Sequence, residues 1–274
     1  MRTEIRITPH KKLFNIGFRE LWEYRELAYF FVWRDIKVRY KQAVIGVLWV
    51  LFQPFITMII FTVFFGRLAK VPSDGIPYPI FVYVGLLLWQ YFSFGLAHSS
   101  GSMVSNANIV QKIYFPRLIL PISSSLIGIV DFFVASFILL GLMVYYHYTP
   151  SLMGILLLPV LLLVTFMASV GLGCFLAAVN VKYRDVRYVI PFFTQILMFL
   201  TPVIYPVSMI SGKFKWLLTL NPMSGIIETA RGTILGTKPV DWSLLSVSIV
   251  VSAVLFAVGI IYFRKTERFF ADVI

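Results

Sequence analysis

Six long apolar stretches constrain what this chain can fold into more than any other feature. Five of them contain no charged residue, and the third contains one, Asp131. An α-helix needs about 20 predominantly apolar residues to cross a bilayer. The stretches therefore predict an all-α polytopic membrane protein with six transmembrane helices, of which the fifth, bracketed by Pro191 and Pro202, is the shortest. The predicted spans lie near 43–66, 80–97, 120–146, 152–178, 189–204 and 243–263.

The charged residues support a membrane location and give an orientation. They make up only 13% of the chain, about half the share in a soluble domain, so the surface of a soluble enzyme cannot be built from them. The formal net charge of +12 would suggest nucleic acid in a soluble protein, but the positions of the charges indicate a membrane surface, and we expect no nucleic-acid partner. The positive-inside rule places both termini in the cytoplasm. Of the 24 basic residues, 18 lie in 1–42, 98–119, 179–188 and 264–274.

The segment 205–236 contains two apolar pieces that are each too short to cross a bilayer. We interpret them as re-entrant or interfacial helices, which are tolerated only where protein covers the exposed backbone. Prolines and glycines interrupt the segment at Pro206, Gly212, Pro222 and Gly236. The predicted divisions of the chain are a cytoplasmic N-terminal segment (1–42), a transmembrane domain (43–263) and a cytoplasmic tail (264–274).

The N-terminal segment contains a predicted amphipathic helix near 18–40. This helix would lie on the cytoplasmic interface with its aromatic rings at headgroup depth. A soluble helix that packs on a partner is an equally open interpretation, and the two are compatible. The apolar positions at roughly helical spacing are Phe18, Trp22, Tyr29, Trp33, Ile36 and Tyr40.

Catalytic and metal-binding motifs are absent from the sequence. It has no GxxxxGK[ST] phosphate loop, no HExxH, no GxSxG and no Cys/His cluster, so we expect no enzyme activity, no metal and no cofactor in this chain. Asp131 is a single carboxylate, too few for an ion-coupled carrier. We expect it to be buried and hydrogen-bonded to a neighbouring helix.

A short helix is predicted in the cytoplasmic loop after the second span. Asn106 is a plausible N-cap, Ile109 and Ile113 fall at i and i+4, and Pro116 ends the helix. Exposed Ile109, Val110 and Ile113 would suit a docking pocket on another protein. The alternative is a helix that packs against the ends of the spans.

Six ordered blocks, which together extend over nearly the whole chain, resemble the polysaccharide-export branch of type-2 ABC permeases. The likeness is greatest to permeases that export lipid-linked O-antigen in Gram-negative envelopes; capsule and teichoic-acid exporters are near relatives. The blocks are WRDIKVRYKQAVIGVLWVLFQP (33–54), NANIVQKIYFPRLILP (106–121), NVKYRDVRYVIPF (180–192), TPVIYPVS (201–208), NPMSGIIETAR (221–231) and FRKTERFFADVI (263–274).

The resemblance implies a homodimer in the bacterial inner membrane, assembled with two copies of a separate ATPase that binds ATP and Mg. The amphipathic helix near 18–32 would correspond to the interface helix of the family. The two short apolar pieces in 205–236 would correspond to its external gate helices. The implied coupling helix offers Asn106, Asn108, Ile109, Val110, Lys112 and Ile113 to the ATPase. The implied gate residues are Tyr205, Asn221, Pro222, Glu228 and Arg231, and we expect Glu228 and Arg231 to pair at i and i+3.

An undecaprenyl-linked polysaccharide would need a protein-lined path, because its hydroxyls would lack partners in hydrocarbon. Aromatic faces suit sugars, so we expect a channel lined by aromatic side chains; lipid-facing packing is the alternative for each one. The candidates are Trp49, Phe52, Phe55, Tyr83, Trp89 and Tyr91. A basic cluster at the cytoplasmic mouth is either a site for the lipid pyrophosphate or an anchor on anionic lipid, and comprises Arg34, Lys37, Arg39 and Lys41.

One other function remains open from the sequence, and a second is disfavoured by it. An ABC exporter of small hydrophobic compounds would need no continuous aromatic channel. An integral-membrane enzyme of glycan assembly would need grouped carboxylates in a loop, whereas Asp74, Glu228 and Asp241 are isolated in the sequence.

Overall fold

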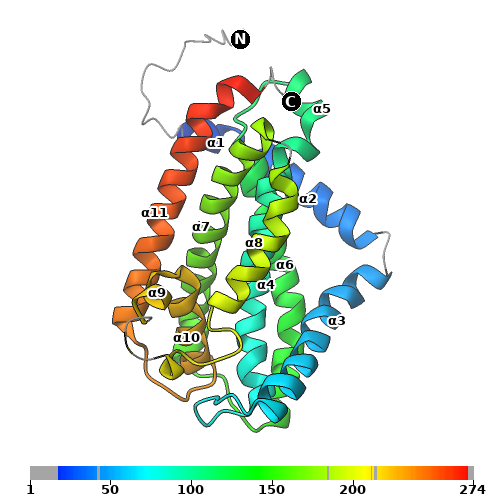
Figure 1. Cartoon of the computed structure of the whole chain (residues 1–274). Coiled ribbons are helices and arrows are strands. Elements are labelled where there is room, and N and C mark those ends of the chain that lie inside the picture. Colours follow the sequence, from blue (N-terminus) through cyan, green and yellow to red (C-terminus); the bar gives the residue numbers. More distant parts are fainter. Residues whose placement is uncertain (1–17, 42–43, 184, 211, 213–214, 271–274) are drawn as a thin grey trace.

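The computed structural model describes residues 18–41, 44–183, 185–210, 212 and 215–270. Within these residues every regular element is a helix (Figure 1), which confirms the predicted all-α fold. The helix α4 packs against both α6 and α7, and α7 packs against α11, so α4 and α7 form the centre of the bundle. The four bundle helices are α4 (Tyr78–Ser105), α6 (Ile119–Tyr145), α7 (Leu152–Lys182) and α11 (Trp242–Thr266).

Five helical segments among the described residues are long and apolar enough to cross a membrane. They are the four bundle helices and Leu48–Leu68, which joins most of α3 (Val44–Phe61) to the π-helix η1 (Thr62–Leu68). The predicted fifth span corresponds to α8 (Val186–Leu200), which is apolar but has only 15 residues. Its length of about 22 Å falls short of the roughly 30 Å of hydrocarbon. The multi-pass architecture is confirmed, and the sixth span stays a prediction.

The close approach of the central helices depends on residues with small side chains. Gly171 of α7 and Gly259 of α11 face each other, and a Cβ at Gly259 would lie 1.9 Å from the carbonyl oxygen of Gly171. Between α4 and its neighbours, Gly95 lies against the hydroxyls of Ser125 and Ser169. Small residues let helix backbones approach closely inside a membrane, where no hydrophobic force drives helices together.

The N-terminal segment forms two helices, α1 (Phe18–Glu23) and α2 (Arg25–Lys41). The aromatic residues of α2 are divided between protein and surroundings: Phe31 is buried against Phe115, whereas Tyr29 and Trp33 are exposed. This division fits an interface helix with one side on the bundle. Residues 1–17, 42–43 and 271–274 of the predicted cytoplasmic segments and first span lie outside the described residues.

The short helices lie at opposite ends of the bundle (Figure 1). At one end are α1 and α5 (Ala107–Lys112), together with the end of α11; at the other are α9 (Lys215–Leu220) and α10 (Pro222–Ile234). The 13-residue α10 is largely buried against α4, α7 and α11. Neither α9 nor α10 is long enough to span hydrocarbon, and their re-entrant placement stays a prediction.

Candidate functional site

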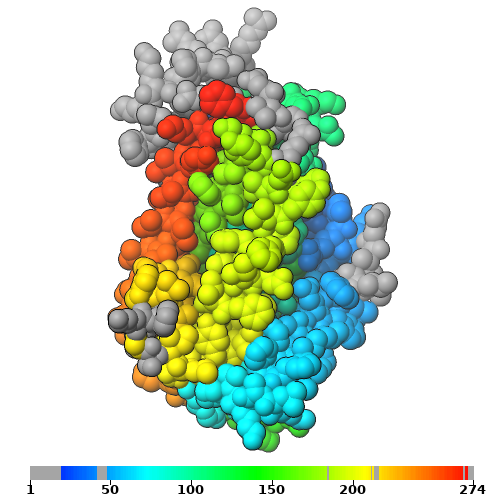
Figure 2. Space-filling model, viewed as in Figure 1, coloured from blue at the N-terminus to red at the C-terminus, as the bar shows by residue number. Residues whose placement is uncertain are grey.

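A cavity of about 460 Å³ lies between α2, α3, α4, α6 and α8. Figure 2 shows α8 (yellow-green) along the surface of this face, with α2 and α3 (blue) beside it. Three of the six predicted channel aromatics line this one cavity: Trp49 of α3 and Trp89 and Tyr91 of α4. Trp49 is 60% exposed, whereas Trp89 and Tyr91 are almost fully buried, so the aromatic wall extends from the core to the surface.

The other three predicted aromatics lie away from the cavity. Tyr83 is fully buried and donates a hydrogen bond from its hydroxyl to the carbonyl oxygen of Ala135, at 2.9 Å. Phe52 is half-exposed on α3, and Phe55 packs partly buried against the core. With 3.6 residues per turn, Trp49 and Phe55 lie about 120° apart around α3, with Phe52 between them, so the three rings spread over the side of the helix. The role of these three side chains in a channel stays a prediction.

Three glutamines that are not among the predicted channel residues also line the cavity: Gln53 of α3, Gln90 of α4 and Gln195 of α8. Each is the only side-chain amide in its predicted span, which is the signal that could have identified them. Their side-chain amides make no hydrogen bond with any other described residue. A carboxamide both donates and accepts hydrogen bonds, so the three amides can bind hydroxyl groups.

Asp131 of α6 lies in the cavity wall and is bonded to α2. Its Oδ2 atom is 2.7 Å from Nη2 of Arg39, and its Oδ1 atom accepts a hydrogen bond from the Tyr40 hydroxyl. The expectation that this carboxylate binds a neighbouring helix is confirmed. Burial and the hydrogen bond to Asp131 raise the pKa of the Tyr40 phenol, so Tyr40 remains a donor at neutral pH. Arg39 and Asp131 together bring no net charge to the cavity.

The remaining residues of the basic cluster have different surroundings. Arg34 donates from Nε to Asp35 at 2.7 Å and from Nη2 to the side-chain oxygen of Asn106 at 3.2 Å, which ties α2 to the start of α5. Lys37 is exposed, and its Nζ atom lies 3.4 Å from the centre of the Trp33 ring. Lys41 is also exposed. Of the four predicted basic residues only Arg39 lines the cavity, and a pyrophosphate site stays a prediction.

The predicted cytoplasmic helix is present as α5, and Asn106 occupies its N-cap position. The Asn106 side chain does not cap α5 but donates instead to the Ser102 carbonyl at 2.9 Å. Val110, expected to be exposed, is only 4% exposed, because it packs into a cluster with Phe31 and Phe115.

The exposed part of α5 and its C-terminal flank contains both polar and apolar side chains. Asn108 and Lys112 are exposed and Ile109 is half-buried. Ile113 is 62% exposed, and its neighbour Tyr114, which is not among the predicted coupling residues, is 71% exposed. The apolar surface available to a partner is therefore Ile113 and Tyr114.

At the opposite end of the bundle, Arg231 of α10 is fully buried. It donates from Nε to the carbonyl oxygen of Phe81 at 3.0 Å and from Nη1 to that of Pro202 at 2.7 Å. Nη2 donates to the carbonyl oxygen of Val203 at 2.5 Å. The absence of a side chain at Gly85 makes room, since a Cβ there would lie 2.7 Å from Nη2.

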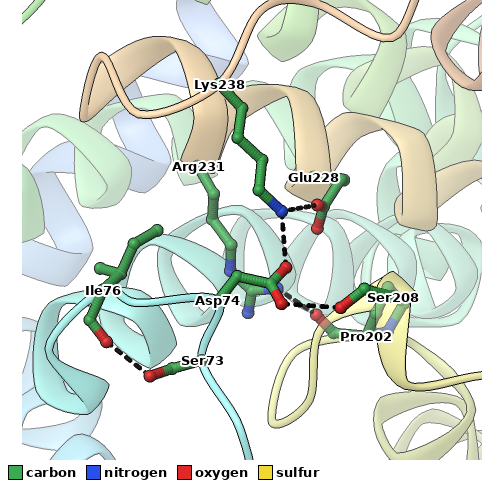
Figure 3. A network of polar contacts seen from close by, with 8 residues as sticks. All are labelled: Ser73, Asp74, Ile76, Pro202, Ser208, Glu228, Arg231 and Lys238. Carbon is green, nitrogen blue, oxygen red and sulfur yellow. Dashed lines mark hydrogen bonds and ion pairs between the residues drawn. The ribbon is translucent and has the colours of Figure 1, made fainter.

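The expected pair between Glu228 and Arg231 is wrong. The guanidinium points between α4 and the turn after α8, where backbone carbonyls match its fork of donors. Glu228 instead lies 3.5 Å from Nζ of Lys238, as Figure 3 shows. Lys238 forms a second, closer ion pair with Asp74 at 2.6 Å, and Ser208 donates to the other oxygen of Asp74 at 2.7 Å.

These contacts connect three loops, which follow η1, α8 and α10. Asp74, Glu228 and Lys238 thus form an ion-pair group, although the two acids are isolated in the sequence. Burial alone would raise the pKa of Asp74, but hydrogen bonds from Lys238 and Ser208 hold it below its usual value. At pH values above the ordinary pKa of a carboxyl group, the ionised Asp74 therefore stabilises the folded state. This contribution is lost only as the pH falls through the lowered pKa of Asp74.

The other predicted gate residues hold the same turn after α8. Asn221 caps α10 by accepting from the backbone N–H of Met223 at 3.0 Å, and its amide donates to the hydroxyl of Thr201 at 2.8 Å. Pro222 occupies the first turn of α10, where a missing N–H costs nothing. Tyr205 donates to the Phe199 carbonyl at 3.1 Å. All five predicted gate residues therefore belong to one end of the bundle, and their role as a gate stays a prediction.

The substitution Arg231→Lys tests how much the buried guanidinium stabilises this end. An ammonium cannot bond three carbonyls in this geometry, and each buried carbonyl left without a donor costs about 1–3 kcal/mol. We therefore expect chemical unfolding in detergent to show that the free energy of unfolding falls by at least this amount. Arg67→Lys is the matched control, because the same substitution at an exposed arginine of η1 removes no hydrogen bond to a described residue. Equal losses in the two variants would contradict this account.

Comparison with known proteins identifies the family. The sequence profile of the ABC-2 type transporters matches residues 26–235. The chain is 29% identical over 255 residues to an O-antigen export system permease from Myxococcus xanthus, covering 92% of this chain and 96% of that protein. It is 26% identical over 241 residues to the corresponding permease from Klebsiella pneumoniae (88% and 92%), and 23% identical over 243 residues to the polysialic acid transport protein KpsM from Escherichia coli (86% and 91%). The chain belongs to the ABC-2 type transporter family.

Proposed function

We propose that this chain is the membrane-spanning permease subunit of an ABC exporter that moves a lipid-linked polysaccharide, an O-antigen, from the cytoplasm to the periplasm. The similarity over nearly the full length to O-antigen export permeases supports this function. An undecaprenyl carrier would hold the polysaccharide at the inner membrane. The permease would not hydrolyse ATP itself, because its sequence lacks a phosphate loop.

The observation that carries the proposal is the lining of the cavity. Trp49, Trp89 and Tyr91 offer aromatic faces to the apolar C–H faces of sugar rings, and the glutamines offer donors and acceptors to hydroxyls. Sugar hydroxyls without partners in hydrocarbon would each cost several kcal/mol. An exporter of small hydrophobic compounds would not need three unpartnered amides in this wall.

The assembly that we propose is a homodimer with two copies of an ABC ATPase, which binds ATP and Mg. The ATPase would contact α5, where Ile113 and Tyr114 are exposed beside Asn108 and Lys112. The end of the bundle with α1 and α5 would face the cytoplasm, because most of the basic residues in the described part of the chain lie in the segments that meet there. The turn held by Arg231 and Asn221 would close the periplasmic end as a gate.

The proposal is tested by removing the chain from the cell that makes it. Undecaprenyl-linked polysaccharide should accumulate inside the cytoplasmic membrane and disappear from the surface, which immunoblots of intact and lysed cells would measure. Purified chain alone should hydrolyse no ATP, and co-expression with its ATPase should give a complex of two and two chains. Normal surface polysaccharide in the deletion strain would refute the export function.

A second experiment separates docking of α5 from packing. Ile113→Asp places a charge on the exposed surface, and we expect it to leave membrane abundance normal but weaken ATPase association by at least about 2 kcal/mol, as for a hot-spot residue. Export and stimulated ATP turnover should then fail together. Val110→Asp is the contrasting variant, because its charge would enter the permease core and lower abundance. Retention of the ATPase by Ile113→Asp, with normal export, would show that α5 does not carry the coupling.

Reporter fusions test the six-span topology. Fusions after Ser73 and Thr237 should report a periplasmic location, and fusions after Val110, Asp185 and Phe270 a cytoplasmic one. The fusions after Asp185 and Thr237 decide whether α8 and the residues that follow it cross the membrane. If both report the same side, α8 is no span and the count falls to five.

A further inference from the structure

We propose that the polysaccharide which this permease moves is built from uncharged sugars, and that the channel wall selects against polyanionic chains. The inference rests on the proposed export function and decides which of two classes of polymer the permease would export. One class is the neutral glycan, and the other carries a negative charge on each repeat, as polysialic acid does. Relatives named for O-antigen and for polysialic acid are both similar to this chain, so the overall likeness does not separate them.

The first observation is the charge of the spanning helices. Asp131 is the only acidic residue, and no Lys or Arg is present, between Leu48 and Gly66 and within Tyr78–Ser105, Ile119–Tyr145, Leu152–Val181 and Trp242–Phe263. The helix α8, which also lines the cavity, has one basic residue, Arg187, in its first turn at the end of the bundle, so the middle of the cavity wall from these helices has no Lys or Arg. Pores for anions and phosphate typically carry rings of Arg or Lys.

The second observation is that the one cation in the cavity wall is already neutralised. Arg39 lies 2.7 Å from Asp131, and Tyr40 occupies the other carboxylate oxygen. An anionic sugar could bind Arg39 only by displacing Asp131. The carboxylate of Asp131 would then lie next to the negative charge of the sugar. Two like charges in a partly buried site repel strongly, because the local dielectric constant is low. The pair therefore does not serve as an anion receptor for the sugar chain.

The third observation is the chemistry of the remaining lining. Gln53, Gln90 and Gln195 are uncharged and can donate to or accept from sugar hydroxyls. Trp49 and Trp89 add aromatic faces that stack on sugar rings. These groups match a neutral glycan, in which each ring presents hydroxyls at its edge and C–H groups on its face. For a polyanion they supply no counter-charge over the thickness of the membrane.

The test compares two probes that differ only in the charge of their sugars. Both are tetrasaccharides linked to undecaprenyl diphosphate, one of glucose and one of glucuronic acid, in which a carboxylate replaces the C6 hydroxymethyl group of each ring. Binding to the full chain in lipid nanodiscs is followed by quenching of tryptophan fluorescence. We expect the neutral probe to bind at least about tenfold more tightly, since a single uncompensated charge near the wall has an effect of that order.

Charge variants of the pair sharpen the comparison. Asp131→Asn frees Arg39 and should shift the ratio of the two affinities toward the acidic probe by about tenfold at low salt, less at high salt. Arg39→Gln should shift the ratio the other way, and the double variant should restore it. Asp185→Asn removes the same charge at an exposed site outside the cavity and should leave the ratio unchanged. The ratio is informative even where a variant weakens both probes.

The possible results separate this inference from the proposed function. If the wild-type chain binds both probes equally, or if neither charge variant moves the ratio, selection against polyanions is wrong while export of polysaccharide stands. If neither probe binds to the wild-type chain, the proposed function fails and the inference fails with it. A preference for the neutral probe that follows the charge of the Arg39–Asp131 pair supports both.

Discussion

The contact between Gly171 and Gly259 sets the geometry on which the rest of the bundle depends. Lipid tails are as apolar as leucine, so membrane helices associate through close packing and polar contacts rather than through a hydrophobic force. The missing side chains bring α7 and α11 together at backbone distance. Gly95, Ser125 and Ser169 do the same for α4, α6 and α7. Large aromatic and amide side chains of α4 instead line the cavity.

Charges inside this protein are few, and each has a defined partner. Arg231 is held by three backbone carbonyls, and Asp131 by Arg39 and Tyr40. An unpaired buried charge would cost several kcal/mol, so such sites persist only where the surrounding backbone or a second charge compensates them. The two charges are compensated differently: Arg231 by backbone carbonyls, and Asp131 by an ion pair with Arg39 and a hydrogen bond from Tyr40.

Much of the fold could be predicted from the sequence, because hydropathy and charge bias act along the chain. The five long helices, the helix at 107–112 and the bonded Asp131 all follow from local patterns. The partners of Arg231 could not be predicted, since the i, i+3 spacing to Glu228 is local while the carbonyl of Phe81 is 150 residues away. Likewise the burial of Val110 depends on Phe31 and Phe115, and the three glutamines meet only after the helices pack.

The helix α2 links the two surfaces on which the proposed function depends. Near its middle Arg34 bonds to Asn106 at the start of α5, and near its end Arg39 bonds to Asp131 in the cavity wall. The two arginines are five positions apart along one continuous helix, a rise of about 7.5 Å at 1.5 Å per residue. Because a helix is stiff over that length, a displacement of α5 by a docked partner would move Arg39 as well. The ion pair that keeps the cavity neutral is therefore on the same helix as the contact with α5, and α2 connects α5 to the cavity wall.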